Sequence, residues 1–194
     1  MNNVFVAGGG LDDPDDITHT ARHEAGHAVA ATVLGLGLRF VDVRRRIEAD
    51  GGISLGYTEI TATLKDVIGK GESAALPVLI KIMAGPIAEL AVNPDACRGV
   101  HHLDDKDCAR QFAVAAVCET RIVDNKLAWT NLEERRRAVQ IGALIEKAIG
   151  EAKRLVRTHD AAIAEVARLL LARESLTGPE VAEVVKHHPP NQSA

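Results

Sequence analysis

The apolar residues near the start of the chain recur three or four positions apart, which is the spacing of one helix face. They are Ala21, Ala25, Ala28, Val29 and Val33. This pattern predicts a helix over residues 18–34, and Gly35 and Gly37 are typical residues for its end.

Two short apolar segments follow, at residues 40–43 and 53–58, and Gly51-Gly52 between them favours a turn. They predict two strands. The rest of the pattern is helical and predicts helices over residues 73–91, 104–120, 131–159 and 160–172, and a short one that begins at the capping box of Thr177 and Glu180. We expect the first of these to bend or break at Pro86.

The expected fold class is therefore α+β and predominantly α-helical. The first helix packs beside a small β-sheet, and a C-terminal helical bundle follows. We divide the chain into an acidic, flexible leader (1–16), a core (17–125), a C-terminal helical subdomain (126–186) and a frayed tail (187–194).

Composition narrows the classes of function. A net charge of -4 and an aromatic content of 3% disfavour nucleic acid as a partner. The most apolar stretch, residues 74–92, is interrupted by prolines and charged residues, and no signal peptide is evident, so we expect no membrane insertion. Three cysteines without a close pair make a disulfide framework improbable and favour a cytoplasmic location.

The first predicted helix carries His23-Glu24-Ala25-Gly26-His27. Histidines four positions apart project from one face of a helix and can bind one metal ion, typically Zn2+. Glu24 is then placed to take a proton from a water on that ion, whose pKa zinc lowers to about 7. Gly26 interrupts the helix at a cost of about 1 kcal/mol, which indicates the close approach of another element.

A catalytic zinc usually has three protein ligands, so one is missing from the motif. The candidates are His101, His102, Asp104, Asp105, Asp107, Glu89 and the cysteines Cys97, Cys108 and Cys118. The densest group lies at residues 101–105, which is equally the composition of a solvated helix start. Spacing alone leaves the choice open.

Several segments together resemble the peptidase domain of FtsH-type proteases, the membrane-bound, ATP-driven zinc metalloproteases. Besides the zinc motif, the similar segments are Ser54-Leu55-Gly56-Tyr57-Thr58, Ala84-Gly85-Pro86-Ile87-Ala88-Glu89, Asp105-Lys106-Asp107-Cys108-Ala109, residues 151–155 and Leu176-Thr177-Gly178. They occur in the family's order between about residues 17 and 186.

The resemblance implies that His23, His27 and Asp105 are zinc ligands and that Glu24 is the general base. Asp105 is preferred to Asp104 because this register also aligns Ala109 and Ala113. Glu89 would orient a ligand histidine, or else be a surface helix glutamate. The strand over 53–58 would pair with an extended polypeptide substrate, or else be an ordinary sheet edge.

The chain also departs from this family. It contains no phosphate-binding loop of the Walker type, no membrane helices are expected, and Pro86 replaces the family's usual arginine. The leading hypothesis is therefore an ATP-independent zinc endopeptidase for unfolded or flexible polypeptides. The alternatives are a non-catalytic, zinc-stabilised interaction module and a subunit that works with a separate ATPase. The resemblance suggests hexameric rings, although a homo-oligomer is less strongly implied without the ATPase.

Overall fold

The computed structural model describes residues 14–47, 53–92, 101–118, 120–123 and 126–191. Its elements are, in chain order, α1 (Pro14–Val33), β1 (Leu38–Ile47), β2 (Ile53–Ile60), the 3-10 helix η1 (Leu64–Asp66), α2 (Glu72–Leu90), α3 (His101–Val117), β3 (Arg121–Val123), β4 (Lys126–Ala128), α4 (Asn131–Thr158), α5 (Asp160–Arg173), β5 (Ser175–Thr177) and α6 (Gly178–His187). The predicted α+β class, mostly helical with a small sheet, is confirmed.

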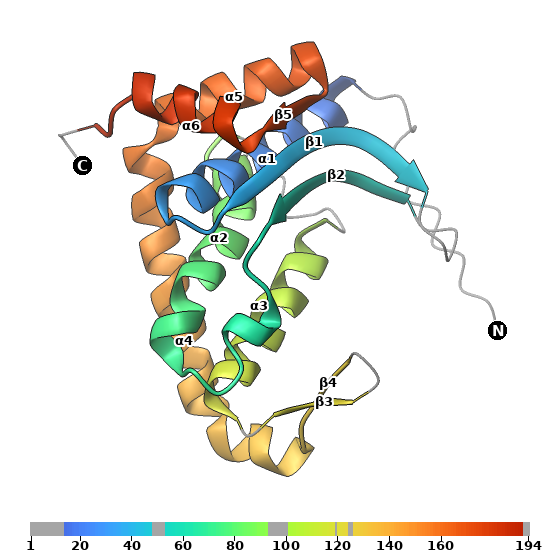
Figure 1. Ribbon diagram of the computed structural model, residues 1–194, viewed down its shortest axis with the longest axis vertical. Helices are drawn as coiled ribbons and strands as arrows, with labels where there is room; N and C mark the ends of the chain where they lie inside the picture. The colour runs from blue at the N-terminus through green and yellow to red at the C-terminus, as the bar shows by residue number, and fades with distance from the viewer. Residues whose placement is uncertain (1–13, 48–52, 93–100, 119, 124–125, 192–194) are drawn as a thin grey trace.

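The helices α1 and α2 pack against each other in the middle of the molecule (Figure 1). The sheet and the helices α5 and α6 lie along α1, while α3 and α4 pack against α2. One apolar cluster joins α1 to β1, α5, β5 and α6, and a second joins α2 to α3 and α4. The segment 126–186 therefore contributes to both clusters, and its treatment as a separate subdomain stays a sequence-based division.

The main sheet has the strand order β2-β1-β5, and both pairings are antiparallel. Val41, fully buried in β1, lies opposite Thr58 on one side and Leu176 on the other. The strand β5 was not predicted. Its three residues carry too short a pattern to be recognised as a strand, and they pair with β1 from the far end of the chain.

Two expectations about the helices need correction. α2 is not broken at Pro86: it continues through this residue as one helix, although a proline inside a helix costs about 3 kcal/mol. Pro86 and its neighbours Gly85 and Ala84 are buried, so packing offsets that loss. In addition, α1 begins at Pro14 and so includes residues 14–16, which we had assigned to the leader; proline is favoured at a first helical position. The remaining leader residues, 1–13, lie outside the described part.

The helix α4 begins at Asn131, as expected, and its cap is Thr130, whose hydroxyl accepts a hydrogen bond from the Glu133 amide at 3.1 Å. The C-terminal tail differs slightly from expectation. In the tail, the Asn191 amide donates to the Thr158 carbonyl at 3.0 Å. The tail is therefore tied to the end of α4 at least as far as residue 191.

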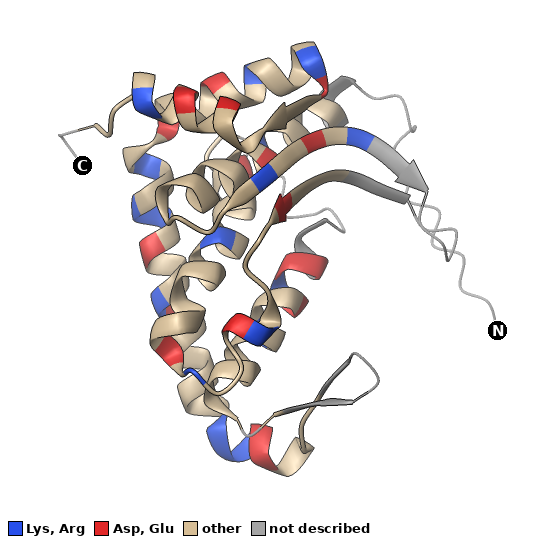
Figure 2. Cartoon of the chain, in the orientation of Figure 1, with Lys and Arg blue, Asp and Glu red and all other residues tan. Residues whose placement is uncertain are grey.

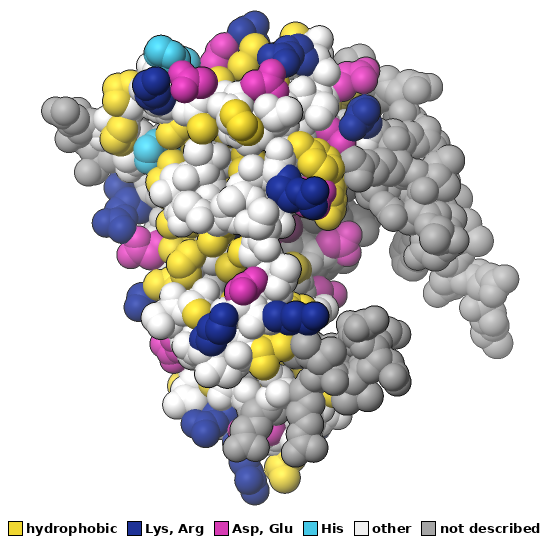
Figure 3. Space-filling model, in the orientation of Figure 1, with side chains coloured by type: hydrophobic (Ala, Val, Ile, Leu, Met, Phe, Trp, Pro, Cys, Tyr) yellow, Lys and Arg dark blue, Asp and Glu magenta, His cyan; other side chains and the backbone are white. Residues whose placement is uncertain are grey.

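The helix α2 has the length and apolar composition of a membrane-crossing segment, and it carries few charged residues (Figure 2). Most of it is buried inside the protein, and a buried core helix meets the same criteria. The expectation that no segment is apolar enough for a membrane span was therefore too strict, and the absence of membrane insertion stays a prediction. On the face that Figure 3 shows, basic and acidic side chains are interspersed.

Candidate metal centre

The helix α1 carries both histidines of the motif on its buried side. His23 and His27 are one turn apart, and their Nε2 atoms lie 3.0 Å from each other. Asp105, in α3, completes the group: its Oδ2 lies 2.9 Å from His23 Nε2, and its Oδ1 lies 3.4 Å from His27 Nε2. One ligand atom from each of the three residues fits within 4.8 Å of the others. This cluster can hold a metal ion.

The other ring nitrogens determine what these atoms can do. His23 Nδ1 lies 2.9 Å from a carboxylate oxygen of Glu89, and His27 Nδ1 lies 2.8 Å from the main-chain oxygen of Lys81. Both oxygens act as acceptors, so each Nδ1 must donate. In the neutral imidazoles, each Nε2 then presents a lone pair.

Three acceptor groups therefore converge on one point. With both histidines neutral, the buried Asp105 Oδ2 receives no hydrogen bond within the described part of the chain. Lone pairs that face one another repel unless a cation lies between them. Two imidazole nitrogens and a carboxylate are donors that suit Zn2+, so the residues present fit the predicted ion, although the same set also suits other transition metals.

Without a metal, a proton takes the place of the cation. Burial lowers the pKa of His23, but hydrogen bonds to Asp105 and Glu89 and the charge of Glu24 raise it more, from 6.5 to about 9. Burial alone would raise the pKa of the Asp105 carboxyl. The charge of His27 and hydrogen bonds from both histidines instead hold this pKa well below its usual range. Metal and proton thus compete for one position.

The strand β2 holds the Glu24 side chain beside this cluster. Its carboxylate is buried and accepts a hydrogen bond from the Thr58 hydroxyl of β2 at 2.5 Å. Gly56, with φ +78°, passes so close that a Cβ there would lie 2.6 Å from Glu24 Cγ. Glu24 directly follows the ligand His23 in the chain, and its negative charge contributes to raising the pKa of His23. The strand therefore fixes the side chain that the motif predicts as a base.

Two glycines allow α1 and α2 to approach this closely. A Cβ on Gly26 would lie 2.6 Å from the Ala84 main-chain oxygen and 2.7 Å from Ala88 Cβ. A Cβ on Gly85 would lie 2.4 Å from the His27 ring. The predicted close approach at Gly26 is confirmed, and the approaching element is α2.

The other candidate ligands lie elsewhere. Asp104 and Asp107 are exposed, Cys108 is half-buried one turn after Asp105, and Cys118 is buried at the end of α3. Cys97 and the side chains of His101 and His102 lie outside the described residues. Glu89 is buried and contacts His23 directly, so its interpretation as a surface glutamate is wrong.

Sequence reasoning missed three contributors to the site. They are the Thr58 hydroxyl, the Lys81 main-chain oxygen and the space left by Gly85. A main-chain contact leaves no trace in residue type. The Gly85-Pro86 pair inside a predicted helix was a usable signal, because both residues are unfavourable there and need a compensating contact.

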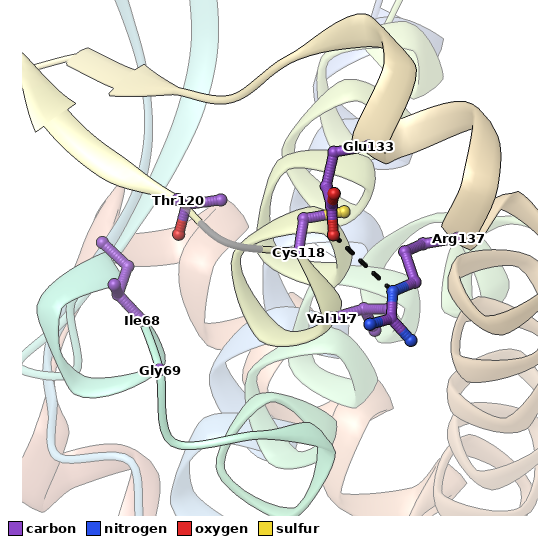
Figure 4. A pocket seen from close by; sticks show the side chains of 7 residues that line it. All are labelled: Ile68, Gly69, Val117, Cys118, Thr120, Glu133 and Arg137. Atoms are coloured by element: carbon purple, nitrogen blue, oxygen red, sulfur yellow. Dashed lines mark ion pairs between the residues drawn. The ribbon is translucent and has the colours of Figure 1, made fainter.

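A cavity of about 400 Å³ lies at the other end of α3 (Figure 4). Its lining residues include Cys118, Thr120, Glu133 and Arg137, and Glu133 pairs with Arg137 at 3.6 Å. None of the metal-cluster residues lines it. It is therefore separate from the candidate metal centre.

Comparison with known proteins adds no assignment: no protein-family model and no curated protein sequence matches the chain. The resemblance to FtsH-type peptidases therefore stays a hypothesis based on the residues quoted above.

Proposed function

We propose that this protein is a zinc-dependent endopeptidase that hydrolyses peptide bonds in unfolded or flexible polypeptides without ATP. The observation that carries the proposal is the convergence of His23 Nε2, His27 Nε2 and the Asp105 carboxylate, with the buried Glu24 carboxylate nearby. Three protein ligands next to a carboxylate base are typical of hydrolytic zinc sites.

Each group in the cluster then has a distinct role. Zinc, when bound, lowers the pKa of a water molecule and polarises a carbonyl. Glu24 accepts the proton from the attacking water and passes it to the leaving amine. Thr58 holds the Glu24 carboxylate in position, and Glu89 and the Lys81 main-chain oxygen fix the tautomers of the two histidines.

The position of β2 supports a polypeptide substrate. β2 is an edge strand in the described sheet, and its Thr58 binds the proposed base. A substrate strand that added to this edge would bring main-chain carbonyls near Glu24. Because a lone peptidase does not unfold its substrates, stable folded domains should resist cleavage. We also propose a cytoplasmic location and a homo-oligomer, whereas delivery by a separate ATPase belongs to an alternative function.

The test is cleavage of casein, an unstructured protein, by zinc-loaded wild type and Glu24→Gln, with zinc content measured on the same samples. We expect equal zinc contents and a loss of cleavage of about 10²-fold or more in the variant. Glu59→Gln is the matched control, since Glu59 lies on β2 but pairs with Arg39 at the surface. Equal cleavage by wild type and Glu24→Gln would reject the mechanism.

Two other outcomes would point to the alternatives. Zinc binding without cleavage by the wild type would favour a non-catalytic, zinc-stabilised interaction module. Cleavage that appears only with ATP and a co-purifying ATPase would favour a subunit that acts with a motor.

A further inference from the structure

Arg22 is a buried arginine that directly precedes the ligand His23 in α1. The helix α1 packs against both α2 and α5 (Figure 1), and the Arg22 side chain contacts both neighbours. Its Nε donates a hydrogen bond to the Ala88 main-chain oxygen of α2 at 3.3 Å, and its guanidinium pairs with the Asp160 carboxylate of α5. A buried charge is costly unless it is paired and hydrogen-bonded, and these two contacts supply the partners.

The Ala88 oxygen belongs to the last turn of α2. The last four carbonyls of an α-helix have no partner within the helix, so the end of a helix needs donors from elsewhere. The carbonyls of Ile87 and Glu89, on either side of Ala88, accept hydrogen bonds at 3.1 Å from amides of the chain that follows the helix. Arg22 supplies a donor to the carbonyl between them. It therefore caps α2 from another helix, and it places a positive charge at the helix end that favours one.

The capped turn also carries the residue that orients a metal ligand. Glu89 follows Ala88, and its carboxylate lies 2.9 Å from His23 Nδ1. Arg22 and His23 are neighbours on α1, just as Ala88 and Glu89 are neighbours on α2. The two hydrogen bonds therefore join the same short segments of the two helices, and movement of the Ala88 main chain would move Glu89 relative to the ligand.

The contact with α5 holds the guanidinium from its other side. Asp160 lies in the first turn of α5, where a negative side chain is favourable, and its side chain is 56% exposed. Ion pairs with an exposed partner contribute little to stability. The pair with Asp160 is therefore better explained as a contact that directs Arg22 towards Ala88 than as a main source of stability.

We propose that Arg22 is a positioning residue of the metal centre, which caps the last turn of α2 and so keeps Glu89 aimed at His23. This inference rests on the zinc site of the proposed function, but not on turnover.

The experiment is a double-mutant cycle in which zinc affinity is measured by competition with a chromogenic chelator. It compares the wild type, Arg22→Met, Glu89→Ala and the protein that carries both substitutions. Methionine keeps an unbranched side chain but donates no hydrogen bond. Arg173→Met is the matched control, because Arg173 of α5 pairs with Glu180 of α6 rather than with α2. Urea unfolding checks that each variant is folded.

We expect Arg22→Met to lower zinc affinity about tenfold, at the lower end of the range for residues that support metal ligands, because Arg22 acts one contact further from the metal. In the Glu89→Ala background, the same substitution should change zinc affinity by less than about twofold, since no carboxylate is left to position. Arg173→Met should match the wild type. A general loosening of the fold would not depend on Glu89, so this coupling distinguishes positioning from a purely structural role.

A zinc affinity of Arg22→Met within about twofold of the wild type would overturn the proposal, and so would an equal loss with and without Glu89. If Arg22→Met does not fold, Asp160→Asn allows the same comparison, because it weakens the hold on the guanidinium but keeps Arg22.

Asp160→Asn should lower zinc affinity about threefold, and only in proteins that contain Glu89. An unchanged affinity, or an equal loss in both backgrounds, would then reject the positioning role. A wild type that binds zinc but does not cleave casein would reject the proposed function and leave this result intact.

Discussion

Gly26 of α1 lies directly against the Ala84 main chain of α2: a Cβ at Gly26 would lie only 2.6 Å from the Ala84 oxygen. Gly26 lies between the ligands His23 and His27 in the sequence. The helix α2 also supplies the hydrogen-bond acceptors for both histidine rings. The close packing of the two helices is therefore part of the construction of the metal cluster.

Substitution of this glycine tests the packing. Gly26→Ala should destabilise the protein by about 1–3 kcal/mol, because overpacking a close helix contact outweighs the gain in helix propensity. Gly142→Ala in α4 is the matched control, since a Cβ there meets nothing within 4 Å. It should stabilise the protein by about 0.5–1 kcal/mol. Urea unfolding measures the change in the free energy of unfolding for each variant. A Gly26→Ala protein that is more stable than the wild type would contradict the contact.

The role of Glu89 is tested through metal affinity. Glu89→Gln keeps the size of the side chain but removes the negative charge that orients His23. We expect zinc affinity to fall about 10–100-fold, as for other residues that support metal ligands. Competition with a chromogenic chelator measures it. Glu72→Gln, at the start of the same helix, is the control and should match the wild type.

The raised pKa of His23 predicts a pH dependence for the metal-free protein. Its pKa is about 9 in the folded protein against an ordinary value of 6.5, so the protonated ring stabilises the fold most at low pH. This contribution is complete below pH 6.5 and is lost as the pH rises through about 9. The melting temperature of chelator-treated protein should therefore fall across this interval.

Zinc-loaded protein provides the comparison for the pH series. A metal on Nε2 prevents that nitrogen from binding a proton, so the melting temperature should change less over the same interval. Parallel curves for metal-free and zinc-loaded protein would show that His23 is not the group responsible.

Much of the fold could be predicted from local patterns, because the helices bury apolar residues at regular spacing. The face of α4 that packs on α2 and α5, with Ile141, Leu144, Ala148, Ala152 and Val156, is an example. The strand β5 could not be predicted, since its pairing with β1 depends on a distant segment. Continuity of α2 through Pro86 depends on tertiary burial in the same way.

The residues of the site likewise differ in whether local sequence spacing could predict them. His23, Glu24 and His27 lie within one helical turn and follow from their spacing alone. Asp105 comes from another helix, and only the family resemblance selected it over its neighbour Asp104. The structure distinguishes the two by placement: Asp105 faces the histidines, whereas Asp104 is exposed. The contacts of Thr58 and of the Lys81 main chain required the folded chain.

The central claim is that one metal ion is held by His23, His27 and Asp105. The most direct measurement is the zinc content of purified wild type, Asp105→Ala and Asp104→Ala after equal exposure to zinc and removal of the excess. The account predicts about one zinc per chain in the wild type and in Asp104→Ala, and loss of most of it in Asp105→Ala. Full zinc content in Asp105→Ala, or its loss in Asp104→Ala instead, would contradict the account.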